Sequence, residues 1–380
     1  MTRLLLIGAT GSIGRSALDV VRALAPEIRL LGVFARADVA GLAAIAREFD
    51  VSVAGLSDEA ALPALRAALP GVRTGVGEEF LKEAIAGEGV DVVLSAAAGA
   101  AGLPASLHAL RCGRRLALAN KESMVMAGPL LLREAERAGA QILPVDSEHS
   151  AIFQALSAGR PEEVRRLILT ASGGPFRTWS RARIAKATPE DALRHPTWSM
   201  GRKISVDSAT LMNKALELVE ARWLFGVEPG ALDVVIHPQS IVHSMVEFRD
   251  GSIVAQMGPP DMRLPIQFAL TWPRRLPSSL PGFRVADFAA LTFEAPDRER
   301  FPALDAADRA LELSGTAGAV LNAANEVAVE RFLAGEIPFP AIADLVRAVL
   351  ERASIEPDPD LDRILAADSA AREDARLCRT

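Results

Sequence analysis

Residues 4–24 read LLLIGATGSIGRSALDVVRAL and decide the fold of the N-terminal part of the chain. The stretch opens with an apolar strand, continues with the glycine turn GATGSIG at residues 8–14 and ends with a helical segment from Arg15 onwards. This succession lets the backbone approach a pyrophosphate at a helix N-terminus, so it predicts a dinucleotide-binding loop. The spacing is GxxGxxG rather than GxGxxG, and a simple tight turn is the alternative.

Alternating helical and strand-like segments follow and predict a doubly wound, Rossmann-like α/β domain over residues 1–146. The second strand, at residues 30–35, ends at Arg36, where a site specific for NAD usually carries an acidic residue. An arginine at this point favours the 2′-phosphate of NADPH. A surface arginine at a strand end is the alternative.

A later strand, at residues 115–119, delivers Asn120, Lys121 and Glu122 at its C-terminal end. Because ligands of open parallel sheets bind at these ends, the three side chains are candidates for cofactor and substrate contacts. A merely solvated lysine is the alternative for Lys121. The small residues 96–101, which follow another strand, would let a flat ligand lie close to the backbone, although a tightly packed helix start explains them equally well.

The segment LPVDSEHS at residues 143–150 carries two carboxylates, Asp146 and Glu148, on either side of Ser147. In an extended segment, residues two apart point to the same side. Two carboxylates on one side suit a hard divalent cation, Mg²⁺ or Mn²⁺, with Co²⁺ as a further candidate. A solvated acidic turn is the alternative.

Two segments that follow the carboxylate pair predict a phosphate-binding loop and a lid. The loop at residues 171–175 places Ser172 beside paired glycines, and a phosphate can accept hydrogen bonds from the hydroxyl and from exposed backbone amides. The segment RHPTWSMG mixes tryptophan and methionine with proline and glycine, which predicts a mobile lid near residues 194–202. Burial of Trp198 in a core is the alternative.

The stretch 207–226 has the apolar spacing of one long helix, with Asp207 or Ser208 as its cap. In one interpretation Ser208, Asn213 and Lys214 bind a phosphate at the helix N-terminus. Glu217, one turn deeper, then completes the metal site begun by the two earlier carboxylates. The alternative is a surface ion pair between Lys214 and Glu217, worth about 0.3–0.5 kcal/mol.

The rest of the chain predicts support rather than catalysis. Proline-rich sequence at residues 272–296 predicts a linker, and helical patterns over residues 297–380 predict a C-terminal α-helical bundle. We therefore expect an NADPH-binding domain at 1–146, a central α/β catalytic domain at 147–271, the linker and the bundle.

Composition narrows the classes of function. A net charge of -6 offers no electrostatic footprint for nucleic acid. The sequence has no apolar run long enough to cross a bilayer and opens on a strand instead of a signal peptide, so we expect a soluble cytoplasmic protein without a membrane partner. Two cysteines in unrelated contexts argue against a disulfide framework and against a thiolate zinc site, and the lack of tyrosine excludes a tyrosine acid.

Eight segments in matching order resemble the 1-deoxy-D-xylulose 5-phosphate reductoisomerase family. They are GATGSIG, ALANKES, LPVDSEHSAIFQAL, ASGGPF, HPTWSMG, the stretch 206–225, IHPQSIVHSMV and LNAANEVAV. The resemblance implies a homodimer that rearranges the sugar phosphate 1-deoxy-D-xylulose 5-phosphate with a divalent metal. It also implies NADPH-dependent reduction to 2-C-methyl-D-erythritol 4-phosphate in non-mevalonate isoprenoid biosynthesis.

The resemblance also implies residue roles. The catalytic residues would be Lys121, Asp146, Glu148 and Glu217, and the last three would also be the metal ligands. Substrate contacts would come from Lys121, Ser147, Glu148, Ser172, His195, Trp198, Ser208, Asn213, Lys214 and Glu217. NADPH contacts would come from Thr10, Gly11, Ser12, Ile13, Asn120, Glu122 and Gly201, with Arg36, Ala37 and Asp38 near the 2′-phosphate. The family usually has asparagine at the position of Asp38, whose carboxylate would repel a phosphate.

Two other functions match part of the sequence. An aspartate-semialdehyde dehydrogenase shares the opening loop but needs a nucleophilic cysteine, and Cys112 in RCGRR has no apparent partner base. A dinucleotide-sensing regulator would have no reason to carry three carboxylates and a phosphate cradle, and it would bind cofactor without turnover.

Overall fold

The computed structural model describes residues 1–198 and 200–378, which form two compact units. The first unit comprises Met1–Ser123, Leu131–Ser150 and Asp261–Leu280, and the second unit comprises Met124–Leu130, Ala151–Pro260 and Pro281–Thr380. These units differ from the domains expected from the sequence, whose boundaries at 146, 271 and 296 stay predictions. Among the described residues, no helix has both the length and the apolar character needed to cross a bilayer.

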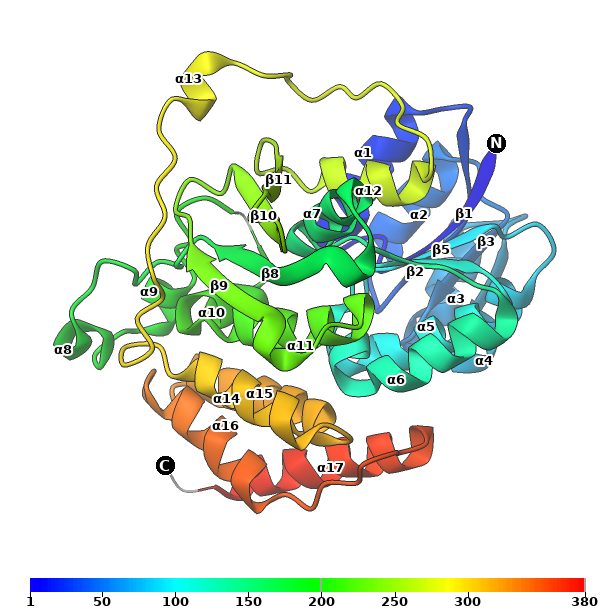
Figure 1. Cartoon of the computed structure of the whole chain (residues 1–380). Helices are drawn as coiled ribbons and strands as arrows, with labels where there is room; N and C mark the ends of the chain where they lie inside the picture. Colours follow the sequence, from blue (N-terminus) through cyan, green and yellow to red (C-terminus); the bar gives the residue numbers. More distant parts are fainter. Residues whose placement is uncertain (199, 379–380) are drawn as a thin grey trace. The chain divides into compact units, whose positions relative to one another are not determined.

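The first unit is built on a seven-stranded parallel sheet (Figure 1). Its strands are β1 (Thr2–Ile7), β2 (Ile28–Ala35), β3 (Val53–Leu56), β4 (Arg73–Val76), β5 (Val92–Ser95), β6 (Arg115–Leu118) and β7 (Ile142–Pro144). Their order in the sheet is β4-β3-β2-β1-β5-β6-β7, so the direction of winding reverses between β1 and β5. Ligands of doubly wound folds bind at such a switch point, outside the carboxyl ends of the strands. The predicted Rossmann-like fold is confirmed.

Six helices pack against strands of this sheet: α1 (Ser12–Ala23), α2 (Val39–Glu48), α3 (Leu62–Ala68), α4 (Gly77–Ala86), α5 (Leu103–Arg111) and α12 (Arg263–Thr271). Helices α6 (Lys121–Ala138) and α7 (Ser147–Ala155) begin in the first unit, and Met124–Leu130 of α6 and the part of α7 from Ala151 belong to the second unit. Helix α12 packs against α1, β6 and β7. Consecutive residues of β1, Leu4, Leu5 and Leu6, are fully buried, because a parallel sheet is covered on both faces. This explains the continuous apolar runs in the sequence.

The second unit combines a four-stranded sheet with a layered set of helices (Figure 1). The strands are β8 (Val164–Ala171), β9 (Leu232–Ile236), β10 (Val242–Phe248) and β11 (Ile253–Met257), in the order β11-β10-β8-β9. Strand β10 is antiparallel to β8 and β11, whereas β9 is parallel to β8. Strand β11 therefore forms one edge of this sheet.

The helices of the second unit, apart from the exposed α13, share one hydrophobic core with its sheet. They are α8 (Arg181–Ile184), α9 (Pro189–Ala192), α10 (Arg202–Thr210), α11 (Met212–Phe225), α13 (Val285–Phe288), α14 (Ala303–Leu313), α15 (Ala317–Leu333), α16 (Ala341–Arg352) and α17 (Leu361–Leu377). Leu167 of β8, Leu216 of α11 and Val320 of α15 belong to the same buried cluster. The predicted C-terminal helical region is confirmed, and it is packed into the core of its unit.

The stretch predicted as one helix over 207–226 is wrong in one respect, because it forms two helices. Leu211 separates α10 from α11 and adopts the left-handed conformation, with φ 61°. The hydroxyl of Thr210 accepts a hydrogen bond from the backbone N–H of the first residue of α11, at 3.2 Å. Asp207 and Ser208 consequently lie inside α10 and do not cap a helix. Apolar spacing did not reveal the break because it continues through it.

Helix α6 begins at Lys121 and contains Pro129 in its interior. The backbone departs from helical geometry at Ala127 (φ −138°, ψ 25°) and then resumes. A proline inside a helix removes one N–H and crowds the preceding turn, which accounts for a kink at this place. The proline therefore marks a kink and does not mark the start of the helix.

A buried histidine lies within the four-stranded sheet. His243 on β10 is 4% exposed, and its Nε2–H donates to the carbonyl of Pro259 at 3.3 Å. Burial lowers the pKa of His243 from 6.5 to about 4, and the nearby His237 and Lys214 add to the effect. The neutral imidazole is therefore the form that the folded chain accepts.

We expect the second unit to lose stability as the pH falls from about 6.5 to about 4. In this window the unfolded state binds a proton on His243 and the folded state does not, so the contribution is complete above the window and lost below it. The shift corresponds to about 3 kcal/mol. Thermal unfolding of the wild type and of His243→Gln across this range should show a flatter pH dependence in the variant. Parallel curves would contradict the assignment.

Candidate functional site

The glycine turn of the first unit lies at the switch point of the sheet. Gly8 has a φ of +83°, and a Cβ there would collide with the carbonyl of Ala96, directly after β5. A Cβ on Gly14 would likewise collide with the carbonyl of Gly8. Glycine is therefore required at both positions, because the loops after β1 and β5 pack backbone against backbone. The small residues 96–101 serve this close packing, which leads through a 3₁₀ turn into α5.

The N-terminus of α1 faces the same edge of the sheet. Gly11 is the N-cap residue, with extended backbone (φ −76°, ψ 178°), and its helix start has no side-chain cap. The first-turn N–H groups of a helix are the donors that a pyrophosphate accepts from. Among the predicted NADPH contacts here, Gly11 and Ser12 are exposed, and Thr10 and Ile13 are half-buried.

The residues after β2 are exposed, as a contact to a 2′-phosphate requires. Arg36, Ala37 and Asp38 all lie at the surface. Asp38 is the N-cap of α2, and its carboxylate accepts a hydrogen bond from the N–H of Gly41 at 2.9 Å. The helix dipole compensates part of the negative charge at this position. Asp38, which departs from the family pattern, therefore has a structural role as the N-cap of α2.

Asn120, Lys121 and Glu122 open helix α6 directly after β6. Asn120 is its N-cap, and the amide oxygen accepts from the N–H of Ser123 at 3.1 Å. The amide nitrogen donates to carbonyls of the 97–99 loop at 2.8 and 2.9 Å and to the carboxylate of Glu122 at 2.9 Å. Asn120 is 2% exposed, so it fastens the small-residue loop to the helix start. The sequence did not reveal this structural role.

The carboxylates of Asp146 and Glu148 lie at a helix start, and the extended geometry expected from the sequence is wrong. Helix α7 begins at Ser147, so Glu148 lies in its first turn, where the helix dipole favours an acidic side chain. The Nζ of Lys121 lies 2.5 Å from Asp146 Oδ2. The hydroxyl of Ser147 donates to Glu148 Oε2 at 2.7 Å. The first unit thus gathers carboxylate oxygens of the kind that a hard cation prefers, next to an ammonium group.

In the second unit, Ser172 of the predicted phosphate-binding loop (residues 171–175) is hydrogen-bonded to His195 of the predicted lid. Ser172 Oγ and His195 Nε2 lie 3.0 Å apart, and His195 Nδ1 accepts from the N–H groups of Thr197 (3.1 Å) and Trp198 (2.9 Å). The Nε2 atom therefore carries the proton and donates to the serine. Burial lowers the pKa of His195, which favours this neutral form. Trp198 is half-buried, and Ser199 lies outside the described residues.

The glycines after Ser172 bring the loop onto helix α10. Gly174 has a φ of +66°, and a Cβ there would come within 2.5 Å of the carbonyl of Ser208. The loop therefore packs on the main chain of α10 at Ser208, which is the second candidate phosphate ligand. Gly201, a predicted NADPH contact, is the exposed N-cap of the same helix.

The first turns of α11 bury a charged cluster. Glu217 Oε1 accepts from Asn213 Nδ2 at 2.5 Å, and Oε2 accepts from Lys214 Nζ. The side chains of Lys214 and Glu217 are 3% and 1% exposed, so the interpretation as a surface ion pair is wrong. Burying two charges costs several kcal/mol per ion, and apolar residues would stabilise the fold at least as well. Such a pair is a candidate functional site for that reason.

Two further buried residues of types that can bind a metal ion were not predicted from the sequence. Glu220 follows Glu217 by one turn of α11, and His149 lies in α7; both are 0% exposed. The available signal for Glu220 was its spacing of three residues from Glu217, which places both carboxylates near one face of a helix. His149 gave no comparable signal.

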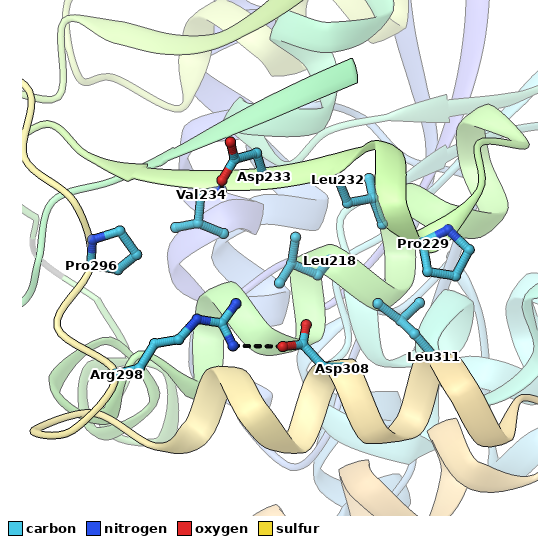
Figure 2. A pocket seen from close by; sticks show the side chains of 9 residues that line it. All are labelled: Leu218, Pro229, Leu232, Asp233, Val234, Pro296, Arg298, Asp308 and Leu311. Atoms are coloured by element: carbon cyan, nitrogen blue, oxygen red, sulfur yellow. Dashed lines mark hydrogen bonds and ion pairs between the residues drawn. The ribbon is translucent and has the colours of Figure 1, made fainter. Parts of the chain in front are cut away.

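A cavity of about 270 Å³ in the second unit lies among other residues (Figure 2). It is lined by Leu218, Pro229, Leu232, Asp233, Val234, Pro296, Arg298, Asp308 and Leu311. Arg298 in this lining is ion-paired with Asp308 at 2.5 Å. The predicted site residues do not line this cavity.

Sequence models of one enzyme family match most of the chain. The model described as 1-deoxy-D-xylulose 5-phosphate reductoisomerase matches residues 4–128. Two models described as C-terminal domains of the same reductoisomerase match residues 142–225 and 257–374.

Curated relatives match over nearly their whole length. The 1-deoxy-D-xylulose 5-phosphate reductoisomerase of Ralstonia nicotianae is 50% identical over 382 residues, which cover 99% of this chain and 97% of the relative. The protein of that name from Caulobacter vibrioides is 50% identical over 377 residues, covering 99% and 93%.

Solved structures of the same name are also similar. The reductoisomerase from Zymomonas mobilis in complex with NADPH is 43% identical with a TM-score of 0.93, covering 99% of this chain and 98% of that chain. A DOX-P reductoisomerase in complex with NADPH, fosmidomycin and magnesium is 40% identical with a TM-score of 0.94 and the same coverage. With the glycine turn, the carboxylates and the phosphate loop in their expected order, the chain belongs to the 1-deoxy-D-xylulose 5-phosphate reductoisomerase family.

Proposed function

We propose that this chain is an NADP-dependent oxidoreductase that rearranges 1-deoxy-D-xylulose 5-phosphate with a divalent metal. Reduction by NADPH then yields 2-C-methyl-D-erythritol 4-phosphate, an isoprenoid precursor. The observation that carries the proposal is the buried cluster of Asn213, Lys214 and Glu217, in a chain half identical to reductoisomerases. A cluster of buried charges is costly for the fold and fits a site that handles a metal and a phosphate.

Asp146, Glu148 and Glu217 are the proposed metal ligands. When bound, a divalent cation supplies Lewis acidity to neighbouring carbonyl and hydroxyl oxygens, and NADPH supplies a hydride. All three residues offer carboxylate oxygens, the donors that Mg²⁺ and Mn²⁺ prefer. Related structures contain magnesium, which supports the choice of metal.

Lys121 and Lys214 are proposed to balance charge next to these carboxylates. The Nζ of Lys121 lies 2.5 Å from Asp146, and the Nζ of Lys214 is bonded to Glu217. An ammonium group held in place stabilises negative charge that develops on a nearby substrate oxygen, and it does so without reorganisation during the reaction. Ser147, bonded to Glu148, is a further proposed contact to the substrate.

The phosphate group is proposed to bind between the loop of Ser172 and the α10–α11 junction. Ser172, Ser208, Asn213 and Lys214 supply hydroxyl, amide and ammonium donors, and His195 adds an N–H from the lid. The phosphate is remote from the reacting carbons, so its binding energy can close the lid and exclude water. Trp198 is proposed to cover the substrate.

NADPH is proposed to bind at the switch point of the first unit. The contacts are Thr10, Gly11, Ser12 and Ile13 at the start of α1, Asn120 and Glu122 at the start of α6, Gly201, and Arg36, Ala37 and Asp38 at the 2′-phosphate. The exposed main chain at Gly11 and the exposed side chain of Arg36 support this arrangement. The free thiols of Cys112 and Cys378 fit a reducing compartment, and we propose a cytoplasmic location.

The direct test is NADPH oxidation with 1-deoxy-D-xylulose 5-phosphate and Mg²⁺ or Mn²⁺, with and without a chelator. We expect oxidation that stops on chelation and a branched polyol phosphate identified by NMR. Folded protein that binds NADPH without turning over this substrate would refute the proposal and favour a dinucleotide sensor.

Glu217→Gln tests the proposed metal ligand. The variant keeps the shape of the side chain, but one of the two carboxylate acceptors becomes an NH₂ donor, so Asn213 or Lys214 loses its acceptor and the stability should fall. We expect the variant, once shown to be folded by circular dichroism, to bind NADPH with an unchanged Kd. Metal-dependent turnover should fall by about 10³-fold or more, because a Lewis acid contributes several kcal/mol. Glu247→Gln, another buried glutamate, which pairs with Arg165 and Arg166, is the matched control and should retain turnover. Equal activity in both variants would remove Glu217 from the site.

We propose a homodimer on the basis of the edge strand of the second unit. In the described part of the chain, β11 has a strand partner on one side only, and Ile253 and Met257 are 56% and 42% exposed. An edge with exposed apolar side chains favours pairing with another chain. Phe283 and Val285 in the same unit are 73% and 72% exposed and offer further apolar surface. A second copy of this chain is the proposed partner.

Ile253→Asp should weaken that dimer, because a carboxylate would be buried at the interface without a partner. Light scattering should give the mass of two 40.3 kDa chains for the wild type and a mass closer to one chain for the variant. Leu365→Asp, at an apolar residue of α17 with 38% exposure, is the matched control and should leave the mass unchanged. A monomeric wild type, or a dimer unaffected by Ile253→Asp, would contradict the proposed interface.

A further inference from the structure

We propose that Asn325, in the C-terminal helical region, is a positioning residue for the phosphate-binding end of α10. The inference rests on the proposed phosphate role of Ser208. Asn325 lies on α15, which packs against α10 within the second unit. It gives the helical region a specific part in substrate binding, beyond the support that the sequence indicates.

The link between the two helices is a buried carboxylate. Asp207 on α10 is 1% exposed and Asn325 is 0% exposed. Asp207 Oδ1 accepts from Asn325 Nδ2 at 2.8 Å, and Oδ2 accepts from Lys203 Nζ at 2.9 Å. Each oxygen thus has its own donor. A carboxylate removed from water depends on both donors, because a missing one leaves a buried acceptor unpaired.

Lys203 and Asn325, the two donors to Asp207, have different structural effects. Lys203 and Asp207 are four residues apart on α10, so their ion pair moves with the helix and cannot fix its position. The hydrogen bond from Asn325 comes from another helix. It is therefore this bond that ties the rotation and height of α10 to α15.

A change in that rotation reaches the phosphate ligands directly. Ser208 follows Asp207, and successive residues are about 100° apart around a helix, so any turn that frees Asp207 redirects Ser208 by the same angle. The main chain at Gly174 packs so closely on the carbonyl of Ser208 that a Cβ at Gly174 would lie 2.5 Å from it. The loop that carries Ser172 would shift with it. Binding groups must be held to about 0.5 Å for a productive geometry, so a small rotation is sufficient to weaken phosphate binding.

The same helix offers a matched control. Asn322 lies one turn before Asn325 on α15 and is also 0% exposed. Its Nδ2 approaches Met126 Sδ at 3.5 Å and donates to Glu326 Oε1 at 3.1 Å. Asn322→Ala therefore removes a buried amide from the same helix and leaves the bond to Asp207 in place. The general cost of a lost buried amide is common to both variants.

The experiment compares Asn325→Ala and Asn322→Ala in the full chain. We expect Asn325→Ala to raise the KM for 1-deoxy-D-xylulose 5-phosphate and the inhibition constant of inorganic phosphate in parallel, by about tenfold. The KM for NADPH should change by less than about twofold, and Asn322→Ala should leave all three constants near those of the wild type. Equal constants in the two variants, or a KM for NADPH that rises with the KM for the sugar phosphate, would overturn the proposal.

A charge exchange tests the bond even if the alanine variants fold poorly. Asn325→Asp places two carboxylates face to face and should weaken phosphate binding. In the double variant Asp207→Asn with Asn325→Asp, the amide nitrogen at 207 donates to the carboxylate at 325 and the amide oxygen accepts from Lys203. We expect the double variant to recover most of the phosphate affinity lost in Asn325→Asp. A double variant as weak as the single variant would refute a positioning bond.

The outcome is separable from that of the proposed function. Calorimetric titration of inorganic phosphate into wild type and variants needs no turnover. A wild type that binds phosphate but does not convert 1-deoxy-D-xylulose 5-phosphate would refute the proposed function and leave the role of Asn325 measurable. A wild type that turns over the substrate with Asn325→Ala indistinguishable from it would refute only the present inference.

Discussion

The buried ion pair between Lys214 and Glu217 is the constraint around which the second unit is arranged. Charges removed from water must be met by donors and acceptors at short range, and here Asn213 and Lys214 meet Glu217 from within the first turns of the same helix. Removing one partner would strand the other in the core. Helix α11 therefore has one orientation in which its charged residues find hydrogen-bond partners and its apolar residues are buried. In that orientation its apolar residues pack in the core against the sheet and α14.

The same requirement recurs at the other buried acids. Asp146 lies next to Lys121 in the first unit, and Asp207 lies between Lys203 and Asn325 in the second. Each pairing holds a polar group in a defined direction before any ligand arrives. Groups that are fixed in a low-dielectric environment stabilise charge without reorganising, which is the property that a site for a metal, a phosphate and a developing oxyanion needs. At these positions the burial of charged groups lowers the stability of the fold but fixes the direction of the polar groups.

Much of the fold was predictable because local chemistry and tertiary packing agree there. A strand, a glycine turn and a helix in succession indicated the Rossmann-like fold, and the buried parallel strands read as continuous apolar runs. The errors arose where the apolar spacing does not report the backbone conformation. The break at Leu211 lies inside an unbroken apolar period. The pair Asp146 and Glu148 was expected in an extended segment, but α7 begins between them.

The order of the main elements, the glycine turn, the residue types of the candidate site and the family can be inferred from the sequence. They follow from spacing and composition, which act over a few residues. The three-dimensional structure was needed to show that the Lys214–Glu217 pair is buried, that Asp38 caps a helix and that Asn325 donates a hydrogen bond to Asp207, 118 residues away in the chain. Burial and hydrogen-bond partners depend on which distant segments pack together, and no local pattern carries that information.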